Sequence, residues 1–97
     1  MFTYYHGTKN SDGVLDALLG GGVLRTGFHL AVKPSVAANY GRVIKITSEV
    51  DLTMAHVGLI NKDGNSNASV GNEIEVVLKT PASINQLLMN LYDAELI

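Results

Sequence analysis

The chain contains no cysteine and only two prolines among its 97 residues. The lack of cysteine excludes disulfides, thiolate metal sites and cysteine nucleophiles. Because small secreted domains often depend on disulfides, it also favours a reducing compartment, and we expect a cytoplasmic protein. No apolar run is long enough to span a bilayer. Residues 1–10 carry polar groups too early for a signal peptide.

A large excess of charge of one sign is missing as well. The formal net charge is −2, and the seven lysines and arginines are spread along the chain. Nucleic-acid binding needs clustered basic residues, so this pattern argues against a strong electrostatic hold on DNA or RNA, while contact with a nucleotide-sized anion stays open. The three histidines follow no common metal-ligand spacing, so we expect no metal site.

The length and ordinary composition indicate a single domain over residues 1–97. Alternating or β-branched runs predict strands over residues 2–6, 28–32, 42–52 and 72–79. Apolar spacing predicts helices over residues 11–19, 34–40 and 84–91, with Ser11 and Ser83 as N-caps. Residues 54–60 are apolar and ambiguous, and residues 62–69 predict an exposed loop. This order of elements indicates an α+β fold.

The segment Tyr5-His6-Gly7-Thr8 lies at the end of the first predicted strand. It is the first of three segments with polar groups that a hydrophobic core does not need. His6 can present its imidazole at a cleft there, and Gly7 lets a ligand approach the main chain closely. The alternative is a strand-end histidine that packs beside its aromatic neighbours.

Two later segments carry similar signals. His29 and Tyr40 can present flat rings to a planar ligand. Alternatively, Tyr40 is a core residue at a helix end and His29 lies on the solvent face. Glu73 and Glu75 share one face of a predicted strand, where like charges oppose each other. The alternative for both is the solvent face of a sheet.

In their joint order these segments resemble the ADP-ribosyltransferase family, above all its branch of poly(ADP-ribose) polymerases and diphtheria-type toxins. The first motif of that branch, His-Gly-Ser or His-Gly-Thr, corresponds to residues 6–8. Its second motif (Gly, apolar, Tyr, apolar, Ala) is similar to residues 27–31, and its Ser-x-x-Ala-Asn-Tyr helix to residues 35–40. A final strand that begins Asn-Glu is matched at residues 72–73. The resemblance implies a minimal version of that fold, a split antiparallel β-sheet with short helices.

The resemblance also implies how NAD would bind as the substrate. His6 would hydrogen-bond a ribose hydroxyl, and the backbone of Gly7 would hold the nicotinamide carboxamide. Tyr40 would stack on the nicotinamide ring. The cofactor-binding residues expected from these motifs are His6, Gly7, Thr8, His29, Ser35 and Tyr40. The final glutamate would hydrogen-bond the nicotinamide ribose and stabilise the cationic sugar as nicotinamide leaves.

The chain departs from the family pattern at three positions. His29 stands where the second motif usually has tyrosine, which gives a His-His-Glu set and adds a titratable ring. A similar second histidine occurs in the RNA 2′-phosphotransferase branch, whose arginines have no clear counterpart here. Ala37 replaces a serine that contacts the carboxamide in the polymerases, and Val36 replaces a lysine linked to chain elongation. The resemblance therefore favours transfer of a single ADP-ribose over polymer formation.

Two glutamates compete for the catalytic position. Asn72-Glu73 matches the polymerase pattern. Glu73-Ile74-Glu75 also resembles the Glu-x-Glu motif of arginine-specific transferases, in which the second glutamate acts. We prefer Glu73, because the first motif is of the histidine type, and keep Glu75 as the alternative.

The expected function is NAD-dependent mono-ADP-ribosyl transfer to a macromolecule, for which we expect a protein, with release of nicotinamide. The short chain and the habit of the family suggest a toxin, effector or phage-encoded modifier that acts in a host cytoplasm. Two alternatives stay open: an inactive member that binds a protein or nucleotide ligand, and an NAD glycohydrolase. An enzyme needs Glu73 or Glu75 in a cleft with His6, whereas a binder does not.

Overall fold

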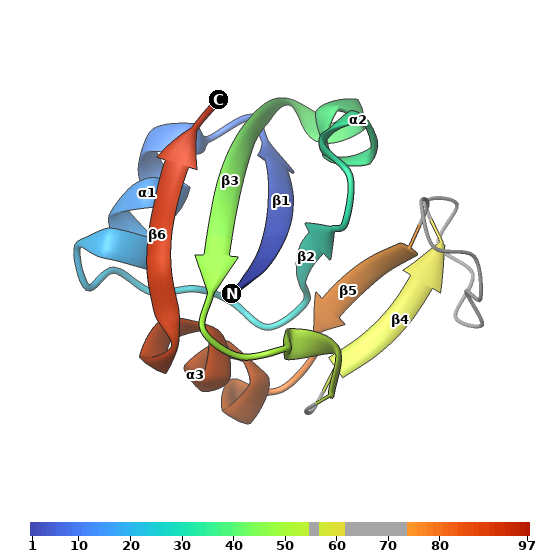
Figure 1. The fold of residues 1–97 in the computed structure, drawn as a ribbon. Coiled ribbons are helices and arrows are strands. Elements are labelled where there is room, and N and C mark those ends of the chain that lie inside the picture. The colour runs from blue at the N-terminus through green and yellow to red at the C-terminus, as the bar shows by residue number, and fades with distance from the viewer. Residues whose placement is uncertain (55–56, 62–73) are drawn as a thin grey trace.

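Six strands form one sheet in the computed structural model, which describes residues 1–54, 57–61 and 74–97. The strands are β1 (Phe2–Thr8), β2 (Phe28–Ala31), β3 (Arg42–Ser48), β4 (Val57–Asn61), β5 (Ile74–Leu78) and β6 (Leu91–Leu96). Their order across the sheet is β4-β5-β2-β1-β3-β6, and every neighbouring pair is antiparallel (Figure 1). The described helices are α1 (Ser11–Leu19), α2 (Pro34–Ala37) and α3 (Pro81–Met89), with the 3₁₀ turns η1 (Ala38–Tyr40) and η2 (Leu52–Met54). The α+β class predicted from the sequence is confirmed.

The larger core lies on the face of the sheet that α1 and α3 cover. Successive side chains of a strand point to opposite faces, and one alternate set meets the helices here. The core contains Tyr4, Leu30, Ile44, Ile46, Val76 and Leu78 from the strands, Leu18 from α1, and Ile84 and Leu87 from α3. Full burial of one such side chain contributes about 1.5–3 kcal/mol. These contacts therefore hold both helices on the sheet.

The α2 helix covers the opposite face. A smaller cluster forms there from Tyr5, Ala31, Val36, Ala37 and Val43. A Cβ atom at Gly7 would lie 1.7 Å from the carbonyl oxygen of Ala37. Even the methyl group of an alanine would collide with the helix backbone. The α2 helix can therefore rest directly on β1 only because residue 7 is glycine.

β1 and β2 are neighbours in the sheet, yet they pair over a very short stretch. β1 pairs with β3 along its whole length, whereas its described register with β2 is Tyr5 opposite Ala31. β2 in turn pairs with β5 from Phe28 to Ala31. The sheet thus has two halves, β6-β3-β1 and β2-β5-β4, and it opens between them beyond the single paired position (Figure 1).

Two strands differ from the sequence prediction. β3 ends at Ser48 rather than at residue 52, because the Ser48 hydroxyl accepts from the N–H of Val50 and donates to its carbonyl, which turns the chain. β6 was not predicted, and its first residue, Leu91, was assigned to the last helix. That helix ends at Met89, and the next residues pair with β3. Ala94 is the one buried residue of β6, so the strand lacks the alternation that reveals a strand in a sequence.

The two predicted helix caps are wrong by one and three residues. The side chain of Asn10, not Ser11, accepts from the N–H of Gly13 and caps α1. Thr80 caps α3, and Ser83 lies three residues inside, where the two side chains satisfy each other's backbone N–H groups. The predicted strand over residues 72–79 is confirmed over residues 74–78. Glu73 and the predicted loop over residues 62–69 lie outside the described residues.

Candidate functional site

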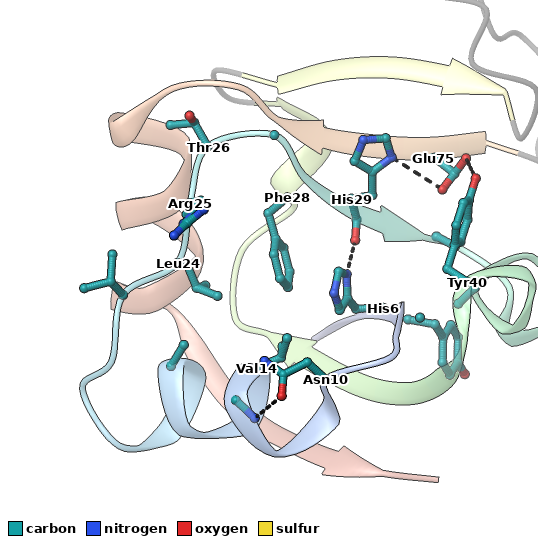
Figure 2. Close-up of a pocket in the computed structure, with 18 residues that line it drawn as sticks. His6, Asn10, Val14, Leu24, Arg25, Thr26, Phe28, His29, Tyr40 and Glu75 are labelled. Atoms are coloured by element: carbon teal, nitrogen blue, oxygen red, sulfur yellow. Dashed lines mark hydrogen bonds and ion pairs between the residues drawn. The ribbon is translucent and has the colours of Figure 1, made fainter.

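A pocket of about 490 Å³ lies where the sheet opens between β1 and β2. Its lining comes from β1, α1, the connector of residues 23–27, β2, the α2–η1 segment and β5 (Figure 2). Small-molecule sites usually occupy about 300–1,000 Å³, so this pocket has the size of one. Its walls bring together His6, His29, Tyr40 and Glu75, which the sequence singled out separately.

Glu75 is a buried carboxylate in the wall of this pocket. Its neighbour Val76 points into the larger core, so Glu75 points to the opposite face, where it is only 2% exposed. The hydroxyl of Tyr40 donates to Oε2 of Glu75 at 3.2 Å, and Nδ1 of His29 lies 3.7 Å from its Oε1. Polar partners of this kind offset the cost of burying a carboxylate. The alternative that Glu75 lies on the solvent face is therefore wrong.

Tyr40 owes its position beside Glu75 to the turn that follows α2. Gly41 ends this turn with a φ of +137°, a backbone conformation that residues with a side chain rarely adopt. A Cβ atom at Gly41 would lie 2.5 Å from the carbonyl oxygen of Thr8, so the chain passes directly over the end of β1. Tyr40 is 42% exposed and lines the pocket, so the alternative that it belongs to the core is wrong.

His6 is fixed between two residues of β2. Its Nδ1 lies 2.6 Å from the carbonyl oxygen of His29, and its ring stacks on Phe28 with centroids 4.0 Å apart and planes 16° apart. A carbonyl oxygen only accepts, so Nδ1 carries the hydrogen. Burial lowers the pKa of His6 below its ordinary 6.5, which favours the neutral ring. The neutral ring keeps Nε2 as an acceptor for a ligand hydroxyl.

The lowered pKa of His6 predicts a loss of stability in mild acid. The unfolded chain takes up the proton near pH 6.5 and the folded chain only at lower pH, so the free energy of unfolding should fall as the pH drops through about 6.5. Hydrogen bonds from Thr53 are the main cause that holds the pKa of Asp51 below 3.8. The loss of stability on protonation of this carboxylate therefore occurs at lower pH than the loss due to His6.

Denaturant unfolding at several pH values tests this prediction. In His6→Asn the amide nitrogen can replace Nδ1 as the donor, and the titrating ring is gone. The variant should lose less stability than the natural protein over the same pH range. The other two histidines are present in both proteins, so equal pH dependence would show that His6 is not the titrating group.

The remaining predicted site residues are divided between the pocket and its surroundings. Gly7 lines the pocket. Thr8 and Ser35 do not belong to its lining: the Thr8 hydroxyl accepts from the N–H of Asn10 at 3.0 Å, and Ser35 is exposed on α2. The cofactor contacts expected of these two residues therefore find no support in the pocket walls. Glu73, the preferred catalytic glutamate, lies outside the described residues.

Phe28 and Arg25 are among the lining residues of the pocket that sequence reasoning did not assign to the site. Phe28 supplies the ring under His6, and Arg25 is the one lysine or arginine among the described lining residues. Figure 2 shows Arg25 on the connector, on the far side of Phe28 from Glu75. The motif around residues 27–31 pointed to this neighbourhood, but the connector before it has no periodicity that would assign its side chains to a site.

Comparisons with protein-family models, with curated proteins and with solved structures find no match for this chain. Within residues 1–54 and 74–97, no three His, Asp or Glu side chains gather as they would around a metal ion. None of the helices described above has the length and apolar character needed to cross a membrane.

Proposed function

We propose that this chain is an NAD-dependent mono-ADP-ribosyltransferase with a minimal form of that family's split-sheet fold. The observation that carries the proposal is the convergence of His6, His29, Tyr40 and Glu75 on one pocket at the opening of the sheet. These residues come from segments that resemble the family's motifs in the family's order. The register of β1 and β2, limited to one described pair, supports the split sheet.

NAD lies across the opening in this proposal. The nicotinamide end occupies the side of Tyr40 and Glu75, with its carboxamide on the backbone of Gly7, and Nε2 of His6 accepts from a ribose hydroxyl. The adenosine end extends toward α1 and the connector. The cationic side chain of Arg25 on that side supports the placement of an anionic dinucleotide, because its charge favours the phosphates.

Glu75 is the catalytic glutamate in this proposal, in place of Glu73. The bond between ribose C1′ and the nicotinamide nitrogen breaks, its electron pair leaves with nicotinamide, and positive charge develops on the sugar. A carboxylate held in a buried wall stabilises that charge without reorganising at the moment of reaction. The hydrogen bond from Tyr40 fixes the carboxylate in position, and attack by a protein side chain at C1′ completes the transfer.

Incubation of the purified protein with NAD labelled in the adenylate part and a cell lysate tests the proposal. We expect labelled protein bands together with released nicotinamide. Nicotinamide release without a labelled macromolecule would identify an NAD glycohydrolase, and NAD binding without any release an inactive binder. Folded protein that neither binds NAD nor releases nicotinamide would contradict the proposal.

Tyr40 has two separable roles in this proposal, which two substitutions distinguish. Tyr40→Phe keeps the ring and removes the hydroxyl that donates to Glu75. Tyr40→Ala removes both. Ring stacking contributes about 0.5–1.5 kcal/mol, so Tyr40→Ala should weaken NAD binding by about two- to tenfold while Tyr40→Phe binds nearly as well as the natural protein. Calorimetric titration with NAD measures both, and equal affinity for the alanine variant would exclude stacking.

A further inference from the structure

His29 occupies a distinctive position at the edge of the pocket. Its side chain is 46% exposed, whereas Glu75 beside it is 2% exposed. Nδ1 of His29 lies 3.7 Å from Oε1 of Glu75, and the two ring nitrogens of an imidazole diverge. Nε2 of His29 is therefore directed away from the carboxylate (Figure 2). The side chain of His29 therefore lies between the buried Glu75 carboxylate and solvent.

We propose that His29 is a further catalytic residue, the general base that removes the proton of the acceptor hydroxyl as its oxygen attacks C1′ of the ADP-ribosyl group. The inference rests on the proposed transferase function and adds to it a role for the residue that replaces the family's tyrosine. The Glu75 carboxylate, 3.7 Å from Nδ1 of His29, suits the ring to this role because a nearby negative charge stabilises the imidazolium that forms.

Glu75 and His6 are less suited than His29 to this step. Glu75 has one carboxylate oxygen bonded to Tyr40 and the other facing His29, and protonation would remove the charge that stabilises the sugar. His6 is bound through Nδ1 to the His29 carbonyl and is stacked on Phe28. Its Nε2 is assigned to a ribose hydroxyl. His29 is the histidine of the described pocket with half of its side chain open to an arriving acceptor.

The proposed step balances in atoms and charge. The C1′–nitrogen bond breaks and its electron pair leaves with nicotinamide. The acceptor oxygen forms a new bond to C1′, and its proton moves to Nε2 of His29. The imidazolium then lies beside the Glu75 carboxylate until it releases the proton to water. The two residues thus act on different groups: Glu75 stabilises the cationic sugar, and His29 accepts the proton of the acceptor.

Methanol serves as a probe acceptor, because its attack on NAD gives methyl ADP-ribose and nicotinamide, which chromatography separates. Loss of a general base typically reduces the rate by about 10²-fold or more, so His29→Ala should form methyl ADP-ribose at least about 100-fold more slowly. Free imidazole added to this variant should restore the rate at least about tenfold, since it can enter the space left by the ring and accept the proton. His6→Ala is the matched control, which imidazole should not restore.

The outcomes separate the two proposals. A natural protein that releases no nicotinamide overturns the transferase function and the role of His29 with it. An active natural protein with an equally active His29→Ala variant overturns the role of His29 alone. A folded variant that is inactive with and without imidazole also overturns the role of His29 as a base. His29 would then hold the pocket in shape rather than accept the proton. His29→Gln, which keeps a polar side chain, must show the same loss if a folding defect of the alanine variant is to be excluded.

Discussion

Glu75→Gln should reduce the release of nicotinamide from NAD by about 10²–10³-fold, the usual effect of removing one group that stabilises transition-state charge. The amide has the size of the carboxylate and can still accept from the Tyr40 hydroxyl, so the pocket wall should keep its shape. What the variant lacks is the negative charge beside the developing cation. Binding of NAD in the ground state should change much less than turnover, because the interaction strengthens as the sugar becomes cationic.

Two further substitutions make the Glu75 result specific. Glu49→Gln removes an equal charge from an exposed site and should leave turnover unchanged, since solvent and salt screen such charges. Glu73→Gln tests the glutamate that the polymerase-like motif favours. If Glu73→Gln abolishes nicotinamide release and Glu75→Gln does not, the assignment of Glu75 is wrong.

Gly7→Ala should destabilise the fold and disrupt the pocket together. The added Cβ would lie 1.7 Å from the carbonyl oxygen of Ala37 and 3.2 Å from the Cβ of Tyr40, so α2 and η1 must move away from β1. Forced movement of packed backbone typically costs about 1–3 kcal/mol. For a domain of this size, each kcal/mol lowers the melting temperature by about 4–8 °C. Thermal unfolding followed by circular dichroism measures the shift.

Gly7→Ala should reduce the free energy of NAD binding by more than it reduces the free energy of unfolding. A shift of η1 moves Tyr40 away from Glu75, and the contact of a ligand with the backbone at residue 7 is lost as well. Thr3→Ala, on an exposed position of the same strand, is the control and should change stability by only about 0.5 kcal/mol. An unchanged melting temperature for Gly7→Ala would show that α2 does not rest on β1 as described.

The larger part of the fold could be predicted from local patterns. Ile44 and Ile46 alternate with polar neighbours, and Val14, Leu15 and Leu18 repeat at helical spacing, so β3 and α1 have clear signals. β6 has none, because its pairing with β3 rather than its own composition keeps it extended. The sequence of a short segment does not reveal pairing of this kind with a distant strand.

The candidate site also combines residues with local sequence signals and a residue whose burial has no such signal. The glycine after His6 and the ring of Tyr40 indicated a ligand site, and both residues line the pocket. The burial of Glu75 could not be predicted, because alternation along β5 indicates a second face of the strand but not that Tyr40 of η1 contacts Glu75 on that face. Sequence order therefore identified the segments of the site. Only the fold shows that Glu75 meets Tyr40 and His29 there.

Titration of ¹⁵N-labelled Glu75→Gln protein with NAD tests the central claim most directly, since this variant should bind NAD without consuming it. We predict that the largest amide shifts fall on both sides of the sheet opening, at His6 and Gly7 of β1 and at Phe28 and His29 of β2. Residues of β6, on the far side of β3, should change little. The absence of shifts at millimolar NAD, or shifts confined to β6 and α3, would contradict an NAD site between β1 and β2.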